Sequence, residues 1–551
     1  MTNEISFYPA DRYADYRAFL TGIREKYSDK PALTWFTRKG EEKSLSYAAF
    51  AEAALSFGEA LLADGIAGAH IGVAGENSAE WLIACFGIIA SGSVAVLVDI
   101  EQPASIIESM LKETDVSLLI ASPSVLSLLA DEAPDCPLRN SAISMSGIGD
   151  RTVSALCEQG RASLAPDSLI FRAEEKPDST AVIAFTSGTT SAAKPVMLSR
   201  RGLLENAAGS ISMVRPSPRV FSSLPFYHTY GLTCGATCIL LAGSHLGING
   251  DMKTVSRDLA RFDPEILMAV PLIVEMLHKK LWAGIEKTGR KGRVQRLIKL
   301  FLAELRLGRR TPFSSLSDVR SKAFGSLTTI VCGGAHLAPR LASELLGFGI
   351  LVLEGYGITE CSPLVSVNRK AAFCLSSAGR VLPGFSVRSA ADGEILVQGP
   401  CVMLGYYNMP EATEAAMEDG WFHTGDLGEI DKNGFLHITG RKKNLIVLKN
   451  GKKIAPEEIE RYLRHIPMVK EAVAYGAASG NSTDDVKLAV SVYPDPAYTE
   501  GMNTYEILER LQREIDSLNL RLPTYKQIQM TSLRAHEFSR TASGKIKRQE
   551  G

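Results

Sequence analysis

A hydroxyl-rich stretch of the sequence lies between an apolar run and a lysine. It reads Phe185-Thr186-Ser187-Gly188-Thr189-Thr190-Ser191-Ala192-Ala193-Lys194. Hydroxyls and backbone N–H groups in such a turn can donate hydrogen bonds to phosphate oxygens, and Lys194 can supply positive charge to a polyphosphate. The stretch is not a P-loop, because Ala193 and Pro195 stand where the Walker pattern needs Gly and then Ser or Thr. It predicts phosphate binding, with a Ser- and Thr-rich surface turn as the alternative.

Three further segments combine aromatic, glycine and acidic residues. They are Pro225-Phe226-Tyr227-His228-Thr229-Tyr230-Gly231, Cys332-Gly333-Gly334-Ala335 and Tyr356-Gly357-Ile358-Thr359-Glu360. The glycines permit close approach of a ligand to the backbone. The ring of Tyr356 can stack on a base, and the Glu360 carboxylate is a hard oxygen ligand of the kind that Mg²⁺ prefers. An isolated histidine such as His228 is more often an ordinary core residue.

Four polar segments follow towards the C-terminus. They are Trp421-Phe422-His423-Thr424-Gly425-Asp426, Gly440-Arg441-Lys442-Lys443-Asn444, Leu448-Lys449-Asn450-Gly451-Lys452-Lys453 and Arg540-Thr541-Ala542-Ser543-Gly544-Lys545. The Asp426 carboxylate can accept hydrogen bonds from two hydroxyls at once. A solvated charge run, an exposed hairpin turn and a basic tail are the alternatives for the last three segments.

The order of these motifs, from about residue 180 onwards, resembles that of the adenylate-forming superfamily, which includes acyl-CoA synthetases, firefly luciferase and peptide-synthetase adenylation domains. The resemblance implies ATP-dependent activation of a carboxylic acid to acyl-AMP, with release of pyrophosphate, and then transfer of the acyl group to CoA. ATP, Mg²⁺ and CoA are the implied cofactors. Two alternatives stay open: transfer to the phosphopantetheine of a carrier protein, and a non-catalytic homologue that binds acyl groups or nucleotides.

The resemblance also implies a role for each matching residue. Lys545 would bridge the carboxylate and the α-phosphate, His228 would border the acyl carboxylate, Thr359 would reach the α-phosphate and Glu360 would bind Mg²⁺. Lys443 would be the hinge of a mobile C-terminal domain, and Gly451 would meet the pantetheine arm of CoA. The implied ATP and AMP contacts are Thr186, Ser187, Gly188, Thr189, Thr190, Lys194, Gly333, Gly334, Ala335, Tyr356, Gly357, Thr359, Asp426 and Arg441.

The phrases around residues 353–360 and 441–447 most resemble bacterial long-chain fatty acyl-CoA synthetases. That resemblance favours a medium- or long-chain fatty acid as the substrate. The phosphate loop departs from the family pattern, since Ser191 and Pro195 replace glycines and Ala193 replaces a proline. Proline fixes φ and removes a donor, so these departures predict altered kinetics with the chemistry retained.

A basic segment between the histidine and glycine motifs resembles an insertion. Residues 279–310 contain eleven Lys or Arg and only two acidic residues, Glu286 and Glu304. Apolar residues recur there at helical spacing, at positions 294, 297, 298, 301, 302 and 305. The helix near residues 293–306 is therefore expected either to rest on an anionic membrane surface or to pack on its own domain.

Apolar runs such as 71–74, 94–98, 118–121 and 181–185 alternate with helical stretches such as 47–63 and 106–114. With 551 residues, two or more domains are expected. The predicted class is α/β: a large N-terminal domain (1–440) of two helix-covered mixed or parallel sheets, with a small β-barrel-like subdomain at about 379–440. A small mobile α+β C-terminal domain (441–551) follows, with its hinge near Lys443.

Composition excludes several classes of protein. A net charge of −1 with 22% charged residues gives no sign of a nucleic-acid partner. The N-terminus lacks the basic and apolar regions of a signal peptide, so a cytoplasmic location is expected, with peripheral association at the inner membrane surface as an option. The uncharged segment 81–98 is expected to be a buried helix, a turn and a buried strand rather than a membrane span. The nine cysteines are expected to be buried free thiols.

Overall fold

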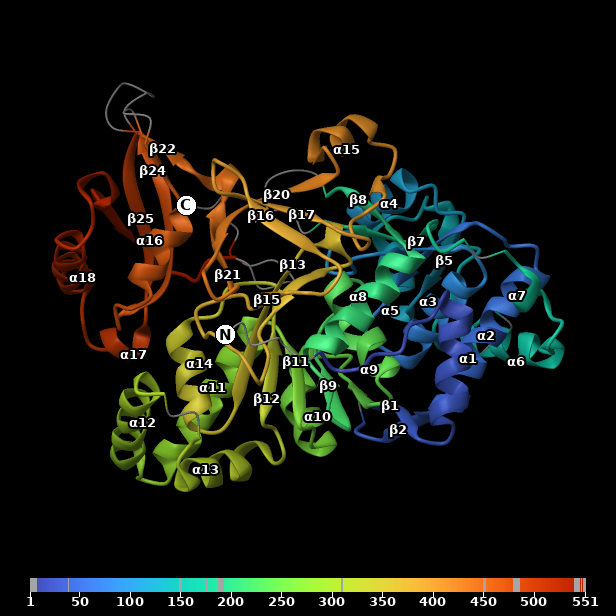
Figure 1. Ribbon diagram of the computed structural model, residues 1–551, viewed down its shortest axis with the longest axis horizontal. Coiled ribbons are helices and arrows are strands. Elements are labelled where there is room, and N and C mark those ends of the chain that lie inside the picture. The colour runs from blue at the N-terminus through green and yellow to red at the C-terminus, as the bar shows by residue number, and fades with distance from the viewer. Residues whose placement is uncertain are drawn as a thin grey trace. The chain divides into compact units, whose positions relative to one another are not determined.

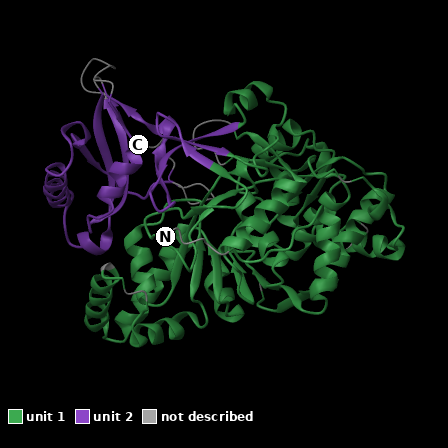
Figure 2. Cartoon of the chain, in the orientation of Figure 1, with its two compact units in different colours: residues 1–186, 192–386, 398–420 green, residues 187–191, 387–397, 421–551 purple. Residues whose placement is uncertain are grey.

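The computed structural model describes residues 7–37, 39–147, 151–174, 176–186, 193–308, 311–448, 452–478, 486–539, 546 and 548 (Figure 1). The chain divides into two compact units (Figure 2). Unit 1 comprises residues 1–186, 192–386 and 398–420, and unit 2 comprises residues 187–191, 387–397 and 421–551. The domain boundary that the sequence analysis placed after Gly440 lies inside unit 2, and that boundary stays a prediction.

One sheet of unit 1 has seven strands in the order β18-β8-β7-β4-β3-β5-β6. The strands are β3 (His70–Ala74), β4 (Val94–Leu97), β5 (Leu118–Ala121), β6 (Ile143–Ser144), β7 (Thr180–Phe185), β8 (Pro195–Ser199) and β18 (Gly405–Tyr406). Strands β3 to β7 run parallel, while β8 and β18 are antiparallel to their neighbours. The predicted alternation of strands and helices is confirmed, and the predicted strands agree with the observed ones to within one residue.

The second sheet of unit 1 has nine strands in the order β15-β14-β13-β12-β11-β9-β10-β1-β2. They are β1 (Pro31–Phe36), β2 (Glu42–Ser46), β9 (Arg219–Ser222), β10 (His245–Ile248), β11 (Ile266–Ala269), β12 (Thr329–Cys332), β13 (Leu351–Gly357), β14 (Leu364–Val367) and β15 (Arg380–Val381). The six strands from β13 to β1 in this order are parallel. Their carboxyl ends therefore share one edge of the sheet, which is where open α/β sheets bind ligands.

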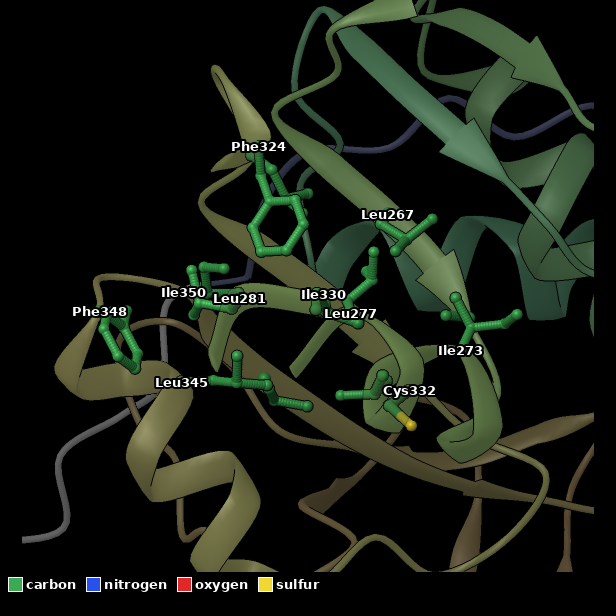
Figure 3. Packing of buried hydrophobic residues seen from close by; sticks show 14 of the residues in the cluster. Leu267, Ile273, Leu277, Leu281, Phe324, Ile330, Cys332, Leu345, Phe348 and Ile350 are labelled. Carbon is green, nitrogen blue, oxygen red and sulfur yellow. The ribbon is translucent and has the colours of Figure 1, made fainter. Parts of the chain in front are cut away.

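Helices α11 to α14 build one core of unit 1 against the second sheet. They are α11 (Pro271–Lys287), α12 (Lys291–Arg306), α13 (Ser314–Phe324) and α14 (Pro339–Gly347). Figure 3 shows how Leu277 and Leu281 of α11 pack beside Ile330 of β12 and Leu345 of α14. The core continues through apolar residues on alternate positions of the strands, as expected for strands with one face towards helices.

The predicted basic amphipathic helix corresponds to α12. Its residues Val294, Ile298 and Phe301 are buried, at spacings of four and three residues. Val294 and Ile298 join the core shown in Figure 3, and Phe301 packs beside the neighbouring residues Leu346 and Leu353. The apolar face of α12 is therefore occupied by its own unit, which leaves the charged face for solvent or a partner.

The uncharged segment 81–98 folds as the sequence analysis expected. It forms most of α3 (Ala79–Ala90), a turn and β4. The helix begins where the Ser78 side chain accepts the N–H of Trp81, a common N-terminal cap. Of the helices in the described part of the chain, none combines the length and hydrophobicity that a bilayer crossing needs.

Helix α2 (Tyr47–Ala63) has the bounds that the sequence predicted and packs between α3 and α6 (Val153–Ser163). Glycines stand at both contacts. A Cβ atom on Gly87 would lie 2.6 Å from the carbonyl oxygen of Ala54, and one on Gly160 would lie 1.9 Å from that of Ser56. The helices therefore approach to backbone contact on both sides of α2.

Other helices of unit 1 surround the two sheets. They are α1 (Tyr16–Tyr27), α4 (Ala104–Glu113), α5 (Pro123–Glu132), α7 (Leu169–Arg172), α8 (Arg200–Met213), the π-helix η2 (Tyr230–Thr237), α9 (Cys238–Leu241), α10 (Val255–Phe262), α15 (Pro410–Ala416) and the 3₁₀ helices η1 (Pro137–Arg139), η3 (Met252–Thr254) and η4 (Thr359–Cys361). All nine cysteines are free thiols, and eight are buried, as predicted; Cys374 is partly exposed.

Unit 2 contains a β-rich part and an α+β part. The β-rich part, at about 379–440, was predicted from the sequence to belong to the N-terminal domain. In the β-rich part, β20 (Trp421–Ile430) pairs antiparallel with β17 (Glu394–Gln398) and with β21 (Leu436–Arg441). The α+β part has the sheet β24-β25-β26, made of Val469–Ala478, Val486–Pro494 and Met530–Leu533. Helices α16 (Pro456–Leu463) and α18 (Thr504–Asn519) contribute Ile459, Leu463, Leu511 and Ile515 to its core.

Candidate active site

Three of the predicted site segments lie just beyond or at the carboxyl ends of parallel strands in the second sheet. His228 follows β9, Gly333 follows β12, and Tyr356 with Gly357 ends β13. Since β9, β11, β12 and β13 are consecutive and parallel, the topology brings these segments to one edge of the sheet. In the sequence, His228 and Gly333 are more than a hundred residues apart.

The histidine segment lies against the glycine segment. The Tyr230 hydroxyl donates to the carbonyl of Val331 at 3.3 Å, and a Cβ atom on Gly333 would lie 3.1 Å from the Tyr230 ring. Glycine at position 333 therefore makes room for the aromatic side chain of η2. Gly334 has φ of +86°, which glycine adopts without strain, and Ala335 is partly buried.

His228 begins the turn that leads into η2. Its carbonyl accepts the N–H of Leu232 at 2.9 Å, and its ring centroid lies 4.8 Å from that of Tyr227. The Tyr227 hydroxyl in turn donates to Glu101 at 3.4 Å. Burial and the nearby Asp99 raise the pKa of the Glu101 carboxyl. The Tyr227 side chain thus contacts both the His228 ring and the Glu101 carboxyl.

The two ends of the phosphate loop are joined by backbone and side-chain hydrogen bonds. The N–H of Thr186 donates to the carbonyl of Lys194, and the N–H of Lys194 donates to the Thr186 hydroxyl, both at 3.0 Å. Pro195 is the first residue of β8, where a strand tolerates the loss of an N–H donor. The predicted phosphate contacts Ser187, Gly188, Thr189 and Thr190 lie outside the described residues.

Lys194 and Glu360 both contact the side chain of Tyr406. The Lys194 Nζ atom lies 4.6 Å from the centroid of the Tyr406 ring, and the Tyr406 hydroxyl donates to Glu360 Oε1 at 3.0 Å. Burial and the Glu360 carboxylate raise the pKa of Tyr406. The structure therefore brings the predicted phosphate lysine and the predicted metal ligand to opposite parts of one phenol.

The turn that carries Thr359 and Glu360 is held by α8 and by the chain before β18. The Met403 N–H donates to the carbonyl of Glu360 at 2.7 Å, and the Asn206 side chain donates to the carbonyls of Cys361 and Leu364 at 3.0 and 2.8 Å. These bonds fix the backbone of η4. The Glu360 side chain is partly exposed, so a ligand can reach it.

Glu360 suits Mg²⁺ as a single protein ligand. Among the described residues, no group of three or more His, Cys, Asp or Glu side chains could enclose a metal ion. Magnesium commonly binds through one or two carboxylates together with substrate phosphates and water. The donor set here, one carboxylate near the predicted phosphate lysine Lys194, fits that manner of binding.

A buried carboxyl lies behind the glycine segment. The Leu337 N–H donates to Glu354 Oε2 at 3.3 Å, and His336 Nδ1 lies 3.9 Å from the same oxygen. Burial raises the pKa of Glu354 to about 8, with the Leu337 hydrogen bond as a smaller opposing effect. Glu354 stands two residues before Tyr356 on β13, so it ties the glycine segment to the strand that carries the tyrosine.

Unit 2 brings together the two residues predicted to bind ribose. Asp426 on β20 and Arg441 on β21 are cross-strand neighbours, with Arg441 Nε 2.7 Å from Asp426 Oδ1. The Asp426 side chain is only 4% exposed. Next to them, Lys442 contacts Asp392 and Glu394 at 2.7 and 2.8 Å. These two carboxylates raise the pKa of Lys442, whose ammonium they stabilise.

Arg548, the last described residue of the chain, is hydrogen-bonded to α16. Its guanidinium makes two hydrogen bonds to Glu460, at 2.7 and 2.8 Å, and a third to Glu457 at 3.2 Å. Asn444 also donates to Glu457, at 2.6 Å. The predicted hinge, Lys443, is exposed. Lys545 and Gly451 lie outside the described residues.

Two family models match the chain. The model described as AMP-binding enzyme matches residues 22–407, and the model described as AMP-binding enzyme C-terminal domain matches residues 443–551. The chain belongs to the AMP-binding enzyme family. The first match alone spans well over half of the chain, and the predicted family is confirmed.

Curated relatives of the chain include long-chain-fatty-acid–CoA ligases. The long-chain-fatty-acid–CoA ligase FadD15 of Mycobacterium bovis is 31% identical over 436 residues, which is 75% of this chain and 72% of that protein. The long-chain-fatty-acid–CoA ligase of Escherichia coli O6:H1 is 28% identical over 539 residues, which is 89% of this chain and 88% of that protein.

Solved structures of other proteins share the fold. ATP-bound MatB from Rhodopseudomonas palustris superposes with a TM-score of 0.75 at 23% identity, covering 97% of each chain. The anthranilate CoA ligase AuaEII, solved with anthranoyl-AMP, gives a TM-score of 0.77 at 18% identity, covering 99% of this chain and 97% of that chain. The predicted α/β class, with a large N-terminal and a smaller C-terminal part, is confirmed.

The sequence analysis did not identify Tyr406, Asn206 or Glu354. Glu354 carried a signal, because it is the one charged residue in the apolar run of β13. Tyr406 and Asn206 carried none, since each acts through a contact with residues 46 or more positions away.

Proposed function

We propose that this AMP-binding enzyme activates a medium- or long-chain fatty acid with ATP and transfers the acyl group to CoA. The observation that carries the proposal is that Lys194 and Glu360 contact one tyrosine, which brings a phosphate-binding cation and a carboxylate suited to Mg²⁺ together. The similarity to long-chain-fatty-acid–CoA ligases supports the choice of acid and of acceptor.

In the first step a carboxylate oxygen attacks the α-phosphorus of ATP, and the bond to pyrophosphate breaks. Both reactants are anions, so the site must neutralise charge and align the attack. Lys194 would hold the phosphate tail, and Glu360 would hold Mg²⁺, which supplies further positive charge when bound. His228 would border the carboxylate, and Thr359 would donate to the α-phosphate. Lys545 would bridge the two reactants.

In the second step the CoA thiol attacks the acyl carbonyl, the bond to AMP breaks, and the thiol proton leaves with the products. No covalent enzyme intermediate is needed.

The adenine would be bound in unit 1 by Tyr356, Gly357, Gly333, Gly334 and Ala335.

In unit 2, Asp426 and Arg441 would bind the ribose. Lys443 would serve as the hinge of the C-terminal domain, and Gly451 would meet the pantetheine arm. These roles follow from the family resemblance and from the pairing of Asp426 with Arg441.

We also propose that the basic face of α11 and α12 contacts an anionic membrane surface. Its exposed cations are Lys279, Lys280, Lys287, Arg290, Lys291, Arg293, Arg296 and Lys299. Because the apolar face of α12 is buried, attraction would be mainly electrostatic, with Leu300 and Leu307, 50% and 89% exposed, as apolar contacts. The protein should sediment with phosphatidylglycerol vesicles but not with phosphatidylcholine vesicles. Charge reversal at Arg293 and Arg296 should abolish this cosedimentation.

The test of the enzymatic activity is pyrophosphate release from ATP and Mg²⁺ across carboxylic acids of increasing chain length, with and without CoA. Release that depends on a fatty acid and turns over many times only with CoA supports the proposal. If CoA supports only a single turnover and a phosphopantetheinyl carrier protein supports many, the acyl acceptor is the carrier protein and not CoA. If the protein binds AMP but releases no pyrophosphate from ATP with any acid, it is a binding protein and the proposed catalysis is wrong.

A further inference from the structure

Strand β18 ends at Tyr406, and a second tyrosine, Tyr407, follows in the turn after the strand. Tyr406 contacts Lys194 and Glu360, as described above. Tyr407 has other partners: its hydroxyl donates to Asp115 at 2.7 Å, and its ring centroid lies 5.1 Å from that of His70. The two residues therefore offer the same hydroxyl-to-carboxylate bond in different surroundings.

The backbone around Tyr406 is held on both sides. Gly405 and Tyr406 pair with Met197 and Val196 of β8, the strand that begins directly after Lys194. The Tyr406 N–H donates to the Thr413 hydroxyl at 2.9 Å, and its side chain is buried. The ring is consequently fixed before any ligand binds, which is the condition for a group that positions others.

Each contact of Tyr406 has a chemical consequence. An ammonium over the face of an aromatic ring is attracted by the ring quadrupole, so the ring favours one placement of Lys194. A hydroxyl that donates to one carboxylate oxygen restricts the orientation of that carboxylate, which remains an acceptor group of the kind that metal ions bind. Outer partners of this kind orient metal-binding carboxylates and raise metal affinity.

We propose that Tyr406 is a positioning residue that orients Glu360 for Mg²⁺ through its hydroxyl and Lys194 for the phosphates of ATP through its ring. The inference rests on the proposed function, because it assumes that ATP and Mg²⁺ bind here. It assigns separate tasks to two parts of one side chain. The two tasks can be separated by substitution.

The test is equilibrium binding of ATP to the full chain by calorimetry, titrated with Mg²⁺ and repeated in EDTA, without fatty acid or CoA. Tyr406→Phe keeps the ring, so it should raise the Mg²⁺ concentration for half-maximal ATP binding about tenfold. Its ATP affinity in EDTA should equal that of the wild type. Tyr406→Leu also loses the ring, so it should in addition weaken ATP binding in EDTA by about three- to tenfold.

Tyr407→Phe is the matched control and should leave both measurements within about twofold, since losing a hydrogen bond at the protein surface usually has a small effect. Thermal unfolding of all variants shows that they are folded. If Tyr406→Phe needs no more Mg²⁺ than the wild type, the positioning role is wrong while the proposed function stands. The same holds if Tyr407→Phe raises the Mg²⁺ requirement as much as Tyr406→Phe does. If the wild type binds no ATP, the proposed function falls as well.

Discussion

In unit 1 the lysine and glutamate of the candidate site contact a shared tyrosine, whereas in unit 2 the aspartate and arginine predicted to bind ribose contact each other. One buried carboxyl in each unit also differs in what surrounds it. Glu354 of unit 1 is stabilised in its neutral form by burial, while Glu460 of unit 2 faces the guanidinium of Arg548.

The difference indicates what substitution should change first in each unit. A cation and a carboxylate that contact the same aromatic side chain are placed to bind one ligand, so their loss should appear in binding. Charges that are buried and paired stabilise the fold as long as both partners are present, so loss of one should appear in stability. Lys545, Arg548, Glu354 and Asp426 allow this distinction to be tested.

The largest effect on activity is expected at Lys545, the proposed catalytic cation. Lys545→Ala should slow adenylation by about 10²–10³-fold, because a charge on the reacting groups is lost. Thioester formation from preformed acyl-AMP should be spared. Single-turnover assays of the two steps measure this, with Lys432→Ala, an exposed lysine of the β20–β21 turn, as the control. An equal loss in both steps would contradict the assignment.

Arg548→Met should destabilise the fold by about 3–5 kcal/mol, because it leaves the Glu460 carboxylate, 5% exposed, without its cation. Chemical denaturation of the variant measures the loss. Arg513→Met is the control, since the Arg513–Glu509 pair is 74% and 51% exposed and should change stability by less than about 1 kcal/mol.

A second change at the same pair sharpens the interpretation. Replacing both partners, Arg548→Met with Glu460→Leu, should restore much of the stability, because no unpaired charge stays buried. If the double variant is as unstable as the single one, the contribution of Arg548 lies in its packing.

Glu354→Gln should remove a pH dependence of stability. The carboxyl has an ordinary pKa of 4.5 and a raised pKa of about 8 in the folded protein. The folded protein therefore holds a proton that the unfolded chain has released, and wild-type stability falls as the pH rises from 4.5 through about 8. The fall should be about 3–5 kcal/mol, the size of this pKa shift in free energy, and absent in the variant. Denaturation of both proteins at low, neutral and high pH decides, and parallel curves would refute the prediction.

Asp426→Asn is expected to give the smallest effect of the four. It should raise the KM for ATP about tenfold, the size typical of one lost hydrogen bond to a charged group, with kcat little changed. Because Asp426 is buried against Arg441, the variant should also lose some stability. Steady-state kinetics in ATP measure this, and Glu429→Gln, an exposed residue of the same strand, is the control. A change in stability alone, with an unaltered KM, would make Asp426 a partner of Arg441 only.

Apolar periodicity was sufficient to predict most of the fold. The bounds of α2 match the prediction because a buried helix flanked by polar caps is visible in the sequence, where the Ser46 side chain accepts the N–H of Ala49. The predicted strands of the first sheet match because parallel strands covered on both faces are continuous apolar runs.

Partners distant in the sequence could not be predicted. The apolar stripe of α12 was evident, but whether it met lipid or protein depended on α14, a separate element. Residues 387–397 belong to unit 2, although the residues before and after them in the sequence belong to unit 1, because β17 pairs with β20. The link from Lys194 through Tyr406 to Glu360 is likewise a product of the tertiary structure.

The glycines beside α2 have a consequence for laboratory evolution. A library that varies this protein can accept new side chains at many exposed positions, but at Gly87 and Gly160 even alanine would place its methyl group against a backbone carbonyl. Recombination with homologues would therefore succeed more often when α2, α3 and α6 are inherited from one parent as a block. These positions limit which chimeras fold, although they lie in a layer to which no ligand contact is assigned.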